Sequence, residues 1–332
     1  MRRREFIGLV GGAAATWPLG AQAQNTNKAP RRIAFFPDLN PVMLEYWQAD
    51  MRVLGWIEGQ DFIVLPSGIE YGSRNPSNED AQRVVANKPD LIFTVSTNYA
   101  LAAQRATGSI PIVMLTSGYP VEAGVADSLA RPGRNVTGNT AYAETGVWGK
   151  LLQLLHEAKP DIKRVGILWT YVVPAFPKEE IEPGYAELNS AARSLNLELH
   201  IVEAANSDQV QAALAEIKER NPDGLLLTSF FALKARSVVT QFAVDKGLPT
   251  IVDADWTRFA PPHPLLCYGP VIRELVQSAV ASVDKILRGA SPGDLPIQRP
   301  SRFELVVSLK TAKAIGLDLS PVLVAQADRV IE

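Results

Sequence analysis

The chain has 332 residues, of which 47% are hydrophobic and 20% are charged, and its formal net charge at pH 7 is −2. This composition is typical of a globular protein and excludes a disordered chain. The balance of 33 basic against 35 acidic residues excludes the strongly basic surface of a nucleic-acid-binding protein. A single cysteine, Cys267, leaves no internal disulfide, so a hydrophobic core has to hold the fold.

Residues 1–23 are predicted to be an export signal. Basic residues at positions 2–4 precede the apolar run Gly8 to Leu19, and Ala21-Gln22-Ala23 has the form of a cleavage site. The apolar run is shorter than the roughly 20 residues that span a bilayer, so the mature protein is not expected to cross a membrane. Arg3-Arg4-Glu5-Phe6-Ile7 fits the twin-arginine form, and an ordinary secretory signal is the alternative. We expect cleavage after Ala23 and a periplasmic location, without a lipid anchor.

The first half of the mature chain alternates short apolar runs with amphipathic segments. Ser77 and Asp80 have the spacing of a capping box, which predicts the start of one helix. Ser96, Thr97 and Asn98 are expected to cap the helix over 99–106, and another helix is predicted to end near Ala130. Buried strands are predicted over 32–36, 61–65, 91–95 and 110–115. Strands that alternate with helices indicate a doubly wound parallel sheet.

Residues 131–140 contain one Pro, two Gly and two Asn, so they are predicted to leave this first sheet as a hinge, with one β-prone step at Val136-Thr137. The strand–helix alternation then begins again. Strands are predicted over 164–169, 197–202, 224–228 and 249–252, and helices over 147–155, 185–195, 210–220 (capped by Ser207) and 232–246. An extended piece over 265–270, a helix over 272–287 and a strand over 303–309 remain after this second set.

The leftover helix and strand indicate that the chain crosses back between two units. We therefore predict an α/β protein with two doubly wound parallel-sheet lobes joined by hinge crossovers. Lobe 1 is expected to contain residues 30–137 plus about 268–297, and lobe 2 residues 138–267 plus about 300–332. The predicted hinges are 135–140 and 265–270, with a third near 296–302.

Ligands of open parallel sheets bind beyond the carboxyl ends of the strands, so the loops that follow the strands of both lobes should surround one cleft. Hydroxyl groups at predicted helix starts suit a carboxylate, which makes Ser96, Thr97 and Ser117 candidate ligand contacts. The carboxylate of Asp38 or Asp253 would suit an ammonium group. Helix capping is the alternative role for the serines, and capping or simple solvation is the alternative for the two acids.

Aromatic residues in the same loops could hold a planar or apolar ligand body. Tyr119, Trp169, Tyr171 and Phe230 are the candidates, and Tyr268 is expected to close the polar end of the site together with the second-lobe acid. Packing between the lobes is the alternative role for these rings. The sequence therefore predicts a small organic acid with an aromatic or branched body as the ligand.

No catalytic or metal-binding pattern accompanies these loops. His156, His200 and His263 are widely separated and lack ligand spacing, so no metal is expected. Glycine-rich phosphate and dinucleotide motifs and the Gly-x-Ser-x-Gly element are absent, and no cofactor is expected. Cys267 is read as a small buried apolar residue, with a cleft thiol as the alternative.

Several segments resemble the ABC transporter substrate-binding protein family, whose better-understood members bind aromatic amino acids. They are the signal, Asn135-Val136-Thr137-Gly138, Tyr268-Gly269-Pro270, Val283 to Ala290, Asp294-Leu295-Pro296, Phe303 to Leu317 and Ala327 to Glu332. The resemblance covers nearly the whole mature chain. It implies a type I periplasmic-binding-protein fold and delivery of a ligand to an ABC permease in the membrane.

Two departures from the family pattern bear on the ligand. Tyr119-Pro120-Val121 stands where the family usually has Asp-Pro-Val, and His263-Pro264-Leu265 replaces Gly-Gly-Leu. Whether the ligand carries an amine therefore stays open. The predicted function is that of a monomeric solute-binding protein rather than an enzyme. An exported enzyme or ligand-sensing module on the same fold is the alternative, because a fold alone does not decide function.

Overall fold

The computed structural model describes residues 29–73, 75–141, 146–170, 183–228 and 235–332. The predicted export signal lies outside the described residues, as do two of the candidate site residues, Tyr171 and Phe230. Residues 31–332 form one unit by their internal contacts. This unit contains two β-sheets, which are described in turn.

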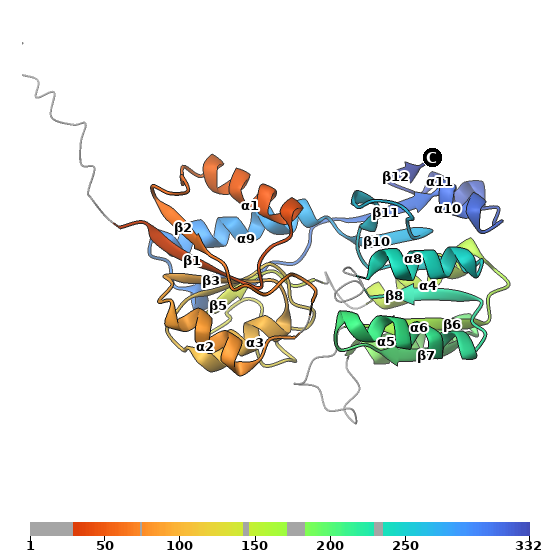
Figure 1. Cartoon of the computed structure of the whole chain (residues 1–332), viewed down its shortest axis with the longest axis horizontal. Helices are drawn as coiled ribbons and strands as arrows, with labels where there is room; N and C mark the ends of the chain where they lie inside the picture. The colour runs from red at the N-terminus through yellow and green to blue at the C-terminus, as the bar shows by residue number, and fades with distance from the viewer. Residues whose placement is uncertain (1–28, 74, 142–145, 171–182, 229–234) are drawn as a thin grey trace, which may run out of the picture. The chain divides into compact units, whose positions relative to one another are not determined.

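The first sheet has five parallel strands in the order β2-β1-β3-β4-β5. The strands are short, buried apolar runs, as expected for a parallel sheet covered on both faces. Helices α1 and α9 pack together on one face, and α2 and α3 on the other (Figure 1). The bounds are β1 (Arg31–Phe36), α1 (Pro41–Val53), β2 (Phe62–Leu65), α2 (Asn78–Ala86), β3 (Leu91–Thr94), α3 (Thr97–Ala106), β4 (Ile112–Met114), β5 (Val136–Gly138) and α9 (Ile272–Leu287).

The second sheet has seven strands in the order β12-β11-β10-β9-β8-β6-β7. Helices α4 and α5 pack together, as do α6 and α8, and the two pairs belong to different hydrophobic clusters. The bounds are α4 (Val147–Ala158), β6 (Arg164–Trp169), α5 (Pro183–Leu195), β7 (Glu198–Glu203), α6 (Val210–Glu219), β8 (Gly224–Leu227), α8 (Arg236–Asp245), β9 (Thr250–Val252), β10 (Leu266–Pro270), β11 (Phe303–Ser308), α10 (Leu309–Ala314), α11 (Pro321–Ala325) and β12 (Arg329–Ile331). Short 3-10 helices are η1 (Ser207–Gln209), η2 (Trp256–Arg258) and η3 (Pro292–Asp294).

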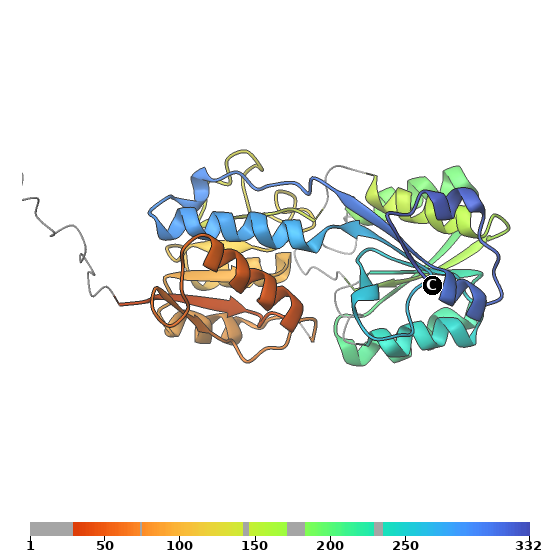
Figure 2. The same cartoon turned by 90° about the horizontal axis from the view of Figure 1, so that it is seen from above.

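Both sheets belong to the predicted α/β class, but the second sheet is not wholly parallel. Strand β11 runs antiparallel to β10. The chain leaves the second sheet through β10, forms α9 on the first sheet, and returns through β11 in the opposite direction. The backbone N–H of Val271 donates to the carbonyl of Arg302 at 3.2 Å, so the two connecting segments run side by side (Figure 2).

Segments that lie far apart in the sequence meet where β5 ends. The backbone N–H of Gln298 donates to the carbonyl of Gly138, and that of Thr140 donates back to the carbonyl of Gln298, both at 2.8 Å. The fully buried side chain of Asn139 donates from Nδ2 to the carbonyls of Leu115 and Leu275 at 2.9 and 2.8 Å. This one amide therefore joins β5, the end of β4 and the start of α9.

Three local predictions from the sequence need correction. The helix expected to end near Ala130 is a series of turns, held by bonds such as that from the N–H of Val125 to the carbonyl of Pro120. The cap of the 210–219 helix region is Asn206 and not Ser207, since the Asn206 side chain accepts from two N–H groups of η1. Segment 136–138, predicted as part of a hinge, is a strand of the first sheet. The capping box of α2, in contrast, is confirmed.

None of the helices in the described ranges is both long and apolar enough to cross a membrane.

Candidate functional site

A pocket of about 130 Å³ is lined by segments that follow strands of both sheets. The start of α1, the segment after β2 and the end of β4 contribute from the first sheet. The segment after β9 and the start of α9 complete it. The lining residues are Asn40, Val42, Met43, Tyr71, Thr116, Ala141, Asp253, Ala254, Asp255, Trp256, Arg258, Phe259, Pro270, Ile272 and Leu275.

The start of α1 reaches the pocket through a tight local motif. Asn40 is the N-cap, its side chain accepts from the backbone N–H of Met43 at 3.0 Å, and Pro41 occupies the first helical position. Proline is favoured there because its missing N–H would have no partner inside the helix. The sequence Asn-Pro therefore fixes where the positive end of the α1 dipole lies.

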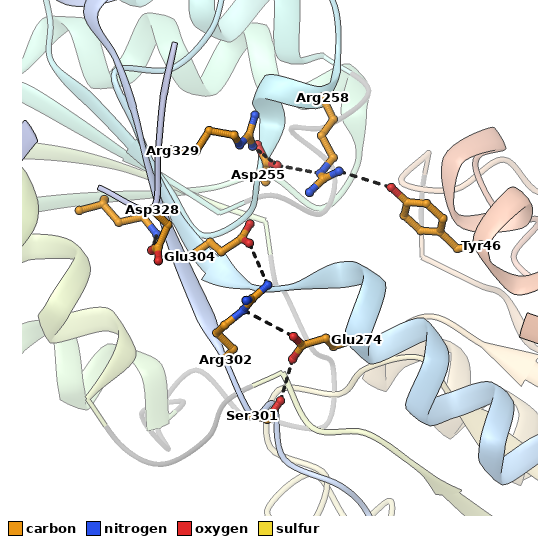
Figure 3. A network of polar contacts seen from close by, with 10 residues as sticks. Tyr46, Asp255, Arg258, Glu274, Ser301, Arg302, Glu304, Asp328 and Arg329 are labelled. Atoms are coloured by element: carbon orange, nitrogen blue, oxygen red, sulfur yellow. Dashed lines mark hydrogen bonds and ion pairs between the residues drawn. The ribbon is translucent and has the colours of Figure 1, made fainter. Parts of the chain in front are cut away.

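The second-sheet wall of the pocket is held by Asp255 (Figure 3). Its Oδ1 accepts from the backbone N–H and the hydroxyl of Thr257 at 3.0 and 2.5 Å. Its Oδ2 lies 2.8 Å from Nε of Arg258 and 2.5 Å from Nη2 of Arg329 in β12. Two guanidinium groups thus neutralise this carboxylate, and η2 is tied to the last strand of the sheet.

A second polar group in Figure 3 lies where β10 leads into α9 and the returning segment enters β11. Arg302 is 3.5 Å from Glu274 and 3.2 Å from Glu304. The hydroxyl of Ser301 donates to Glu274 at 2.7 Å. Arg302 and Ser301 are exposed and the two glutamates are partly exposed, so each ion pair contributes little, on the order of 0–1 kcal/mol.

Among the predicted site residues, Asp253 lines the pocket. It directly follows β9 and is buried. Burial and then the charge of Asp253 raise the pKa of Tyr71, a residue of the segment after β2. Tyr71 is therefore a buried, neutral phenol whose environment includes the charge of Asp253.

The predicted hydroxyl cluster forms, but it lies beside the pocket lining and not in it. The side chains of Thr97 and Ser117 are buried and share a hydrogen bond of 2.8 Å between their oxygens. Ser96 is the N-cap residue of α3 but makes no capping bond, and its hydroxyl has no partner in the part of the chain that the structure describes. Of the hydroxyl residues in this loop set, it is Thr116, next to Ser117, that lines the pocket.

Asp38 has a local structural role. Its Oδ1 accepts from the backbone N–H of Ser67 at 2.6 Å and from its hydroxyl at 3.1 Å, and its Oδ2 accepts from the N–H of Gly68 at 3.1 Å. This carboxylate therefore holds the segment that leads from β2 toward Tyr71.

The predicted rings that the structure describes pack within the protein. Trp169 is buried against Trp148 and Tyr185, with ring centroids 4.8 and 4.7 Å apart. The hydroxyl of Tyr119 accepts from Nε1 of Trp148 at 3.2 Å, which links the end of β4 to α4. Neither Trp169 nor Tyr119 is among the residues that line the pocket.

Tyr268 lies in β10 and not at the pocket. Its ring stacks on Phe303 of the neighbouring strand, with centroids 5.5 Å apart and an interplanar angle of 28°. Burial and the charge of Asp328 raise the pKa of Tyr268. Tyr268 thus packs within the second sheet, whereas Pro270 at the end of the same strand lines the pocket.

Sequence reasoning missed most of the pocket wall. It placed the loops that contain Asn40, Thr116 and Trp256 around the cleft, but it did not choose these residues as ligand contacts, and it missed Tyr71, Arg258 and Phe259. The described residues contain no cluster of three or more His, Cys, Asp or Glu side chains that could hold a metal ion.

The chain matches a family model described as ABC transporter substrate binding protein over residues 71–331. It is 27% identical over 237 residues to a tyrosine-binding protein of Clostridioides difficile, which covers 71% of this chain. The match spans 66% of that relative, just under two thirds of its length.

Solved structures share the fold. A conserved domain protein of Vibrio cholerae superposes with a TM-score of 0.75 at 21% identity, covering 90% of this chain and 99% of that one. The ABC domain of Streptococcus pneumoniae in complex with L-Trp superposes with a TM-score of 0.73 at 18% identity, with the same coverage.

Proposed function

Since this chain belongs to the ABC transporter substrate-binding protein family and has the type I periplasmic-binding-protein fold, we propose that it captures a small organic acid for import. The acid has an aromatic or branched, amino-acid-like body. It binds in the pocket between the connections of the two sheets, and the protein delivers it to the membrane subunits of an ABC permease. The protein acts as a monomer and performs no chemistry on the ligand.

The observation that carries this proposal is the composition of the pocket. Met43, Phe259 and Leu275 provide an apolar wall, and Phe259 is itself backed by the guanidinium of Arg236, 4.5 Å from the ring centroid. An apolar cavity of about 150 Å³ holds a benzene ring, so a pocket of about 130 Å³ suits a single ring or a branched aliphatic group.

Polar groups in the same pocket support an amino-acid-like ligand. Asp253 is a buried carboxylate that suits a ligand ammonium group, and Tyr71 adds a neutral phenol to the same pocket. The relatives whose names mention tyrosine and L-Trp support an aromatic amino acid as the first ligand to test.

Import requires the two sheets to close on the ligand and to open again. Binding between two rigid parts stabilises the closed form by the difference in affinity between the two forms. We propose that closure bends the connections that follow β5, that join β10 to α9, and that precede β11. Small-angle scattering should detect a smaller radius of gyration with ligand, and an unchanged radius at saturation would contradict hinge closure.

The ligand itself is best identified by native mass spectrometry of the purified protein, followed by calorimetric titration with L-tyrosine and L-tryptophan. We expect a co-purified or titrated small acid with a ring or branched body. An uncharged sugar as the bound molecule would remove the proposal of an acid ligand and leave only the solute-binding role. A permease assay in vesicles that contain the transporter then tests delivery.

The proposed location is the periplasm after removal of residues 1–23. N-terminal sequencing of exported protein should begin at Gln24. Replacing Arg3 and Arg4 by lysine should block export if the twin-arginine route is used. Unchanged export of that variant would assign the ordinary secretory route instead.

A further inference from the structure

We propose that Ser207 of η1 is a positioning residue of the binding site. Its backbone N–H and its hydroxyl both donate to the carbonyl of Ser73, at 3.3 Å each, and we call these two bonds the clasp. Ser73 follows β2 of the first sheet and η1 follows β7 of the second, so the clasp joins the two sheets. Through the clasp, Ser207 keeps Tyr71 in place in the pocket and slows the release of the ligand. This inference rests on the proposed function and adds the step that retains the ligand.

The start of η1 presents the two donors of Ser207. Asn206 is the N-cap, and its side chain accepts from the backbone N–H groups of Asp208 and Gln209 at 3.1 Å each. Ser207 is the first residue of η1, and an N–H group at that position has no acceptor inside the helix. The carbonyl of Ser73 therefore supplies, from the other sheet, an acceptor that η1 does not provide for itself.

The acceptor of the clasp belongs to the same turn as a residue of the pocket. The backbone N–H and the hydroxyl of Ser73 donate to the carbonyl of Glu70 at 3.1 and 2.7 Å, which closes a four-residue turn. Tyr71 and Gly72 are its central residues, and the φ of +74° at Gly72 is that of a type II turn. Tyr71 lines the pocket. A force on the carbonyl of Ser73 therefore acts on Tyr71 through a short, hydrogen-bonded piece of backbone.

On the first-sheet side, the turn is attached to the segment that follows β1. Asp38 forms a parallel β-bridge with Glu70, and its N–H donates to the carbonyl of Ile69 at 2.9 Å. On the other side, the turn meets Ser207 of the second sheet. Tyr71 thus lies between a support on its own sheet and a contact with the opposite sheet, so only the closed form fixes it from both sides.

The clasp lies far from the connection between β10 and α9, which is proposed to bend on closure. Strand β7 is an edge strand, and β9, β8 and β6 lie between it and β10. At about 4.8 Å between neighbouring strands, these four steps amount to roughly 19 Å. A contact at this distance from a hinge separates early when the sheets move apart. Breaking the clasp is therefore part of opening, and opening is part of ligand release.

Three variants of Ser207 separate the parts of the clasp. Ser207→Ala removes the hydroxyl, and Ser207→Thr retains a hydroxyl. Ser207→Pro removes both donors. Proline suits this position because it is favoured at the first residue of a helix, and the preceding Asn206 already has the extended backbone angles φ −158° and ψ 170°. Ser194→Ala is the matched control, since the Ser194 hydroxyl donates to the carbonyl of Ser190 within α5.

Stopped-flow fluorescence of the purified protein measures the association and dissociation rates of L-tyrosine. We expect Ser207→Ala to release L-tyrosine about twofold to tenfold faster than the wild type, as for the loss of one hydrogen bond, and Ser207→Pro to release it faster still. Association rates should stay within about twofold, because the clasp forms after the ligand has entered. Ser207→Thr and Ser194→Ala should release L-tyrosine as the wild type does.

Equal dissociation rates for the wild type, Ser207→Ala and Ser207→Pro would overturn the inference and leave the proposed function in place. A lower association rate with an unchanged dissociation rate would overturn it as well. Thermal unfolding of every variant shows whether the fold is retained. A clasp that only stabilised the fold would lower the melting temperature without changing the release of ligand.

A double variant tests whether Ser207 acts through Tyr71. Once Tyr71→Ala has removed the side chain that the clasp positions, Ser207→Ala should accelerate release less than it does in the wild type. Equal effects of Ser207→Ala in the two backgrounds would overturn the positioning role.

A wild-type protein that does not bind L-tyrosine would count against the proposed aromatic ligand, and the clasp is then tested without ligand. Small-angle scattering of the ligand-free proteins should give a larger radius of gyration for Ser207→Pro than for the wild type and Ser194→Ala. Equal radii of gyration for these three proteins would overturn the inference independently of the ligand.

Discussion

Nη1 of Arg258 lies 3.3 Å from the hydroxyl of Tyr46, and this contact joins η2 of the second sheet to α1 of the first. The guanidinium of Arg273 in α9 lies over the ring of Tyr46, 5.3 Å from its centroid. Arg273 also forms an ion pair with Asp50, which lies in α1 together with Tyr46. The pocket wall formed by η2 is therefore in contact with a tyrosine that α1 and α9 hold in place, so this contact is expected to favour the closed form.

Tyr46→Phe should shift the ligand-free protein toward a more open form. A single polar hydrogen bond contributes about 0.5–1.5 kcal/mol, so we expect ligand affinity to fall by less than about tenfold. Small-angle scattering of the ligand-free protein measures the opening. Tyr185→Phe is the matched control, because that hydroxyl donates to Glu203 within the second sheet. Equal radii of gyration for the wild type, Tyr46→Phe and Tyr185→Phe would show that the Tyr46 contact does not favour the closed form.

Trp169→Ala should lower stability first and binding only second. The indole is 1% exposed and packs on two other rings, so its removal leaves a large cavity and costs about 3–5 kcal/mol of unfolding free energy. Urea unfolding followed by circular dichroism gives this loss. The sequence alone suggested that Trp169 holds the body of the ligand. A folded variant of wild-type stability with at least tenfold weaker binding would restore that interpretation.

Gly138→Ala should be strongly destabilising. Its φ is +135°, and a Cβ atom would lie 2.1 Å from the carbonyl oxygen of Met114, where backbone cannot move aside easily. Gly124→Ala is the control, since Gly124 also has a positive φ, +72°, but a Cβ there meets nothing within 4 Å. We expect a loss of about 1 kcal/mol for the control from backbone strain alone. Equal melting temperatures for the two variants would contradict the close approach of β5 to β4.

Cys267 should be chemically silent in the folded protein. Burial raises the pKa of this thiol to about 12, so almost no thiolate exists at pH 8. Ellman's reagent should react only after unfolding, with Cys267→Ala as the blank. Because the folded pKa lies above the ordinary value of 9.0, this group favours the fold below pH 9 and loses that contribution as the pH rises toward 12. Rapid labelling of the native protein would indicate a thiol in the cleft.

The regular elements of the fold were predictable where the chain carries a strong local pattern. Strand β6 and helix α9 have the predicted bounds, since one is an uninterrupted apolar run and the other a long amphipathic segment. Strand β12 was missed because Arg329-Val330-Ile331 is short and only half-buried. The segment after β4 was predicted to be a helix but forms turns. Its spacing of apolar residues is compatible with a helix, whereas Pro120 and the positive φ of Gly124 favour turns.

The candidate site was less predictable, because its walls meet only in three dimensions. The loop rule correctly directed attention to Asp253, but the α1 and α9 starts are more than 200 residues apart and no sequence pattern states that they share a pocket. Trp256 lies in a loop that the sequence places around the cleft, but the sequence does not decide between ligand contact and packing for its ring, which is 2% exposed in the structure.

Helix α9 sets the order in which the molecule can be completed during synthesis. The hydrophobic cluster of the first sheet contains Leu275, Val276, Ala279, Val280 and Val283, which the ribosome adds after the ten strands from β1 to β10. The first sheet to emerge therefore has an apolar face that α1 covers only in part until nearly the whole polypeptide exists. A nascent chain that stops before residue 272 leaves this face open, so cellular chaperones have a defined surface to protect.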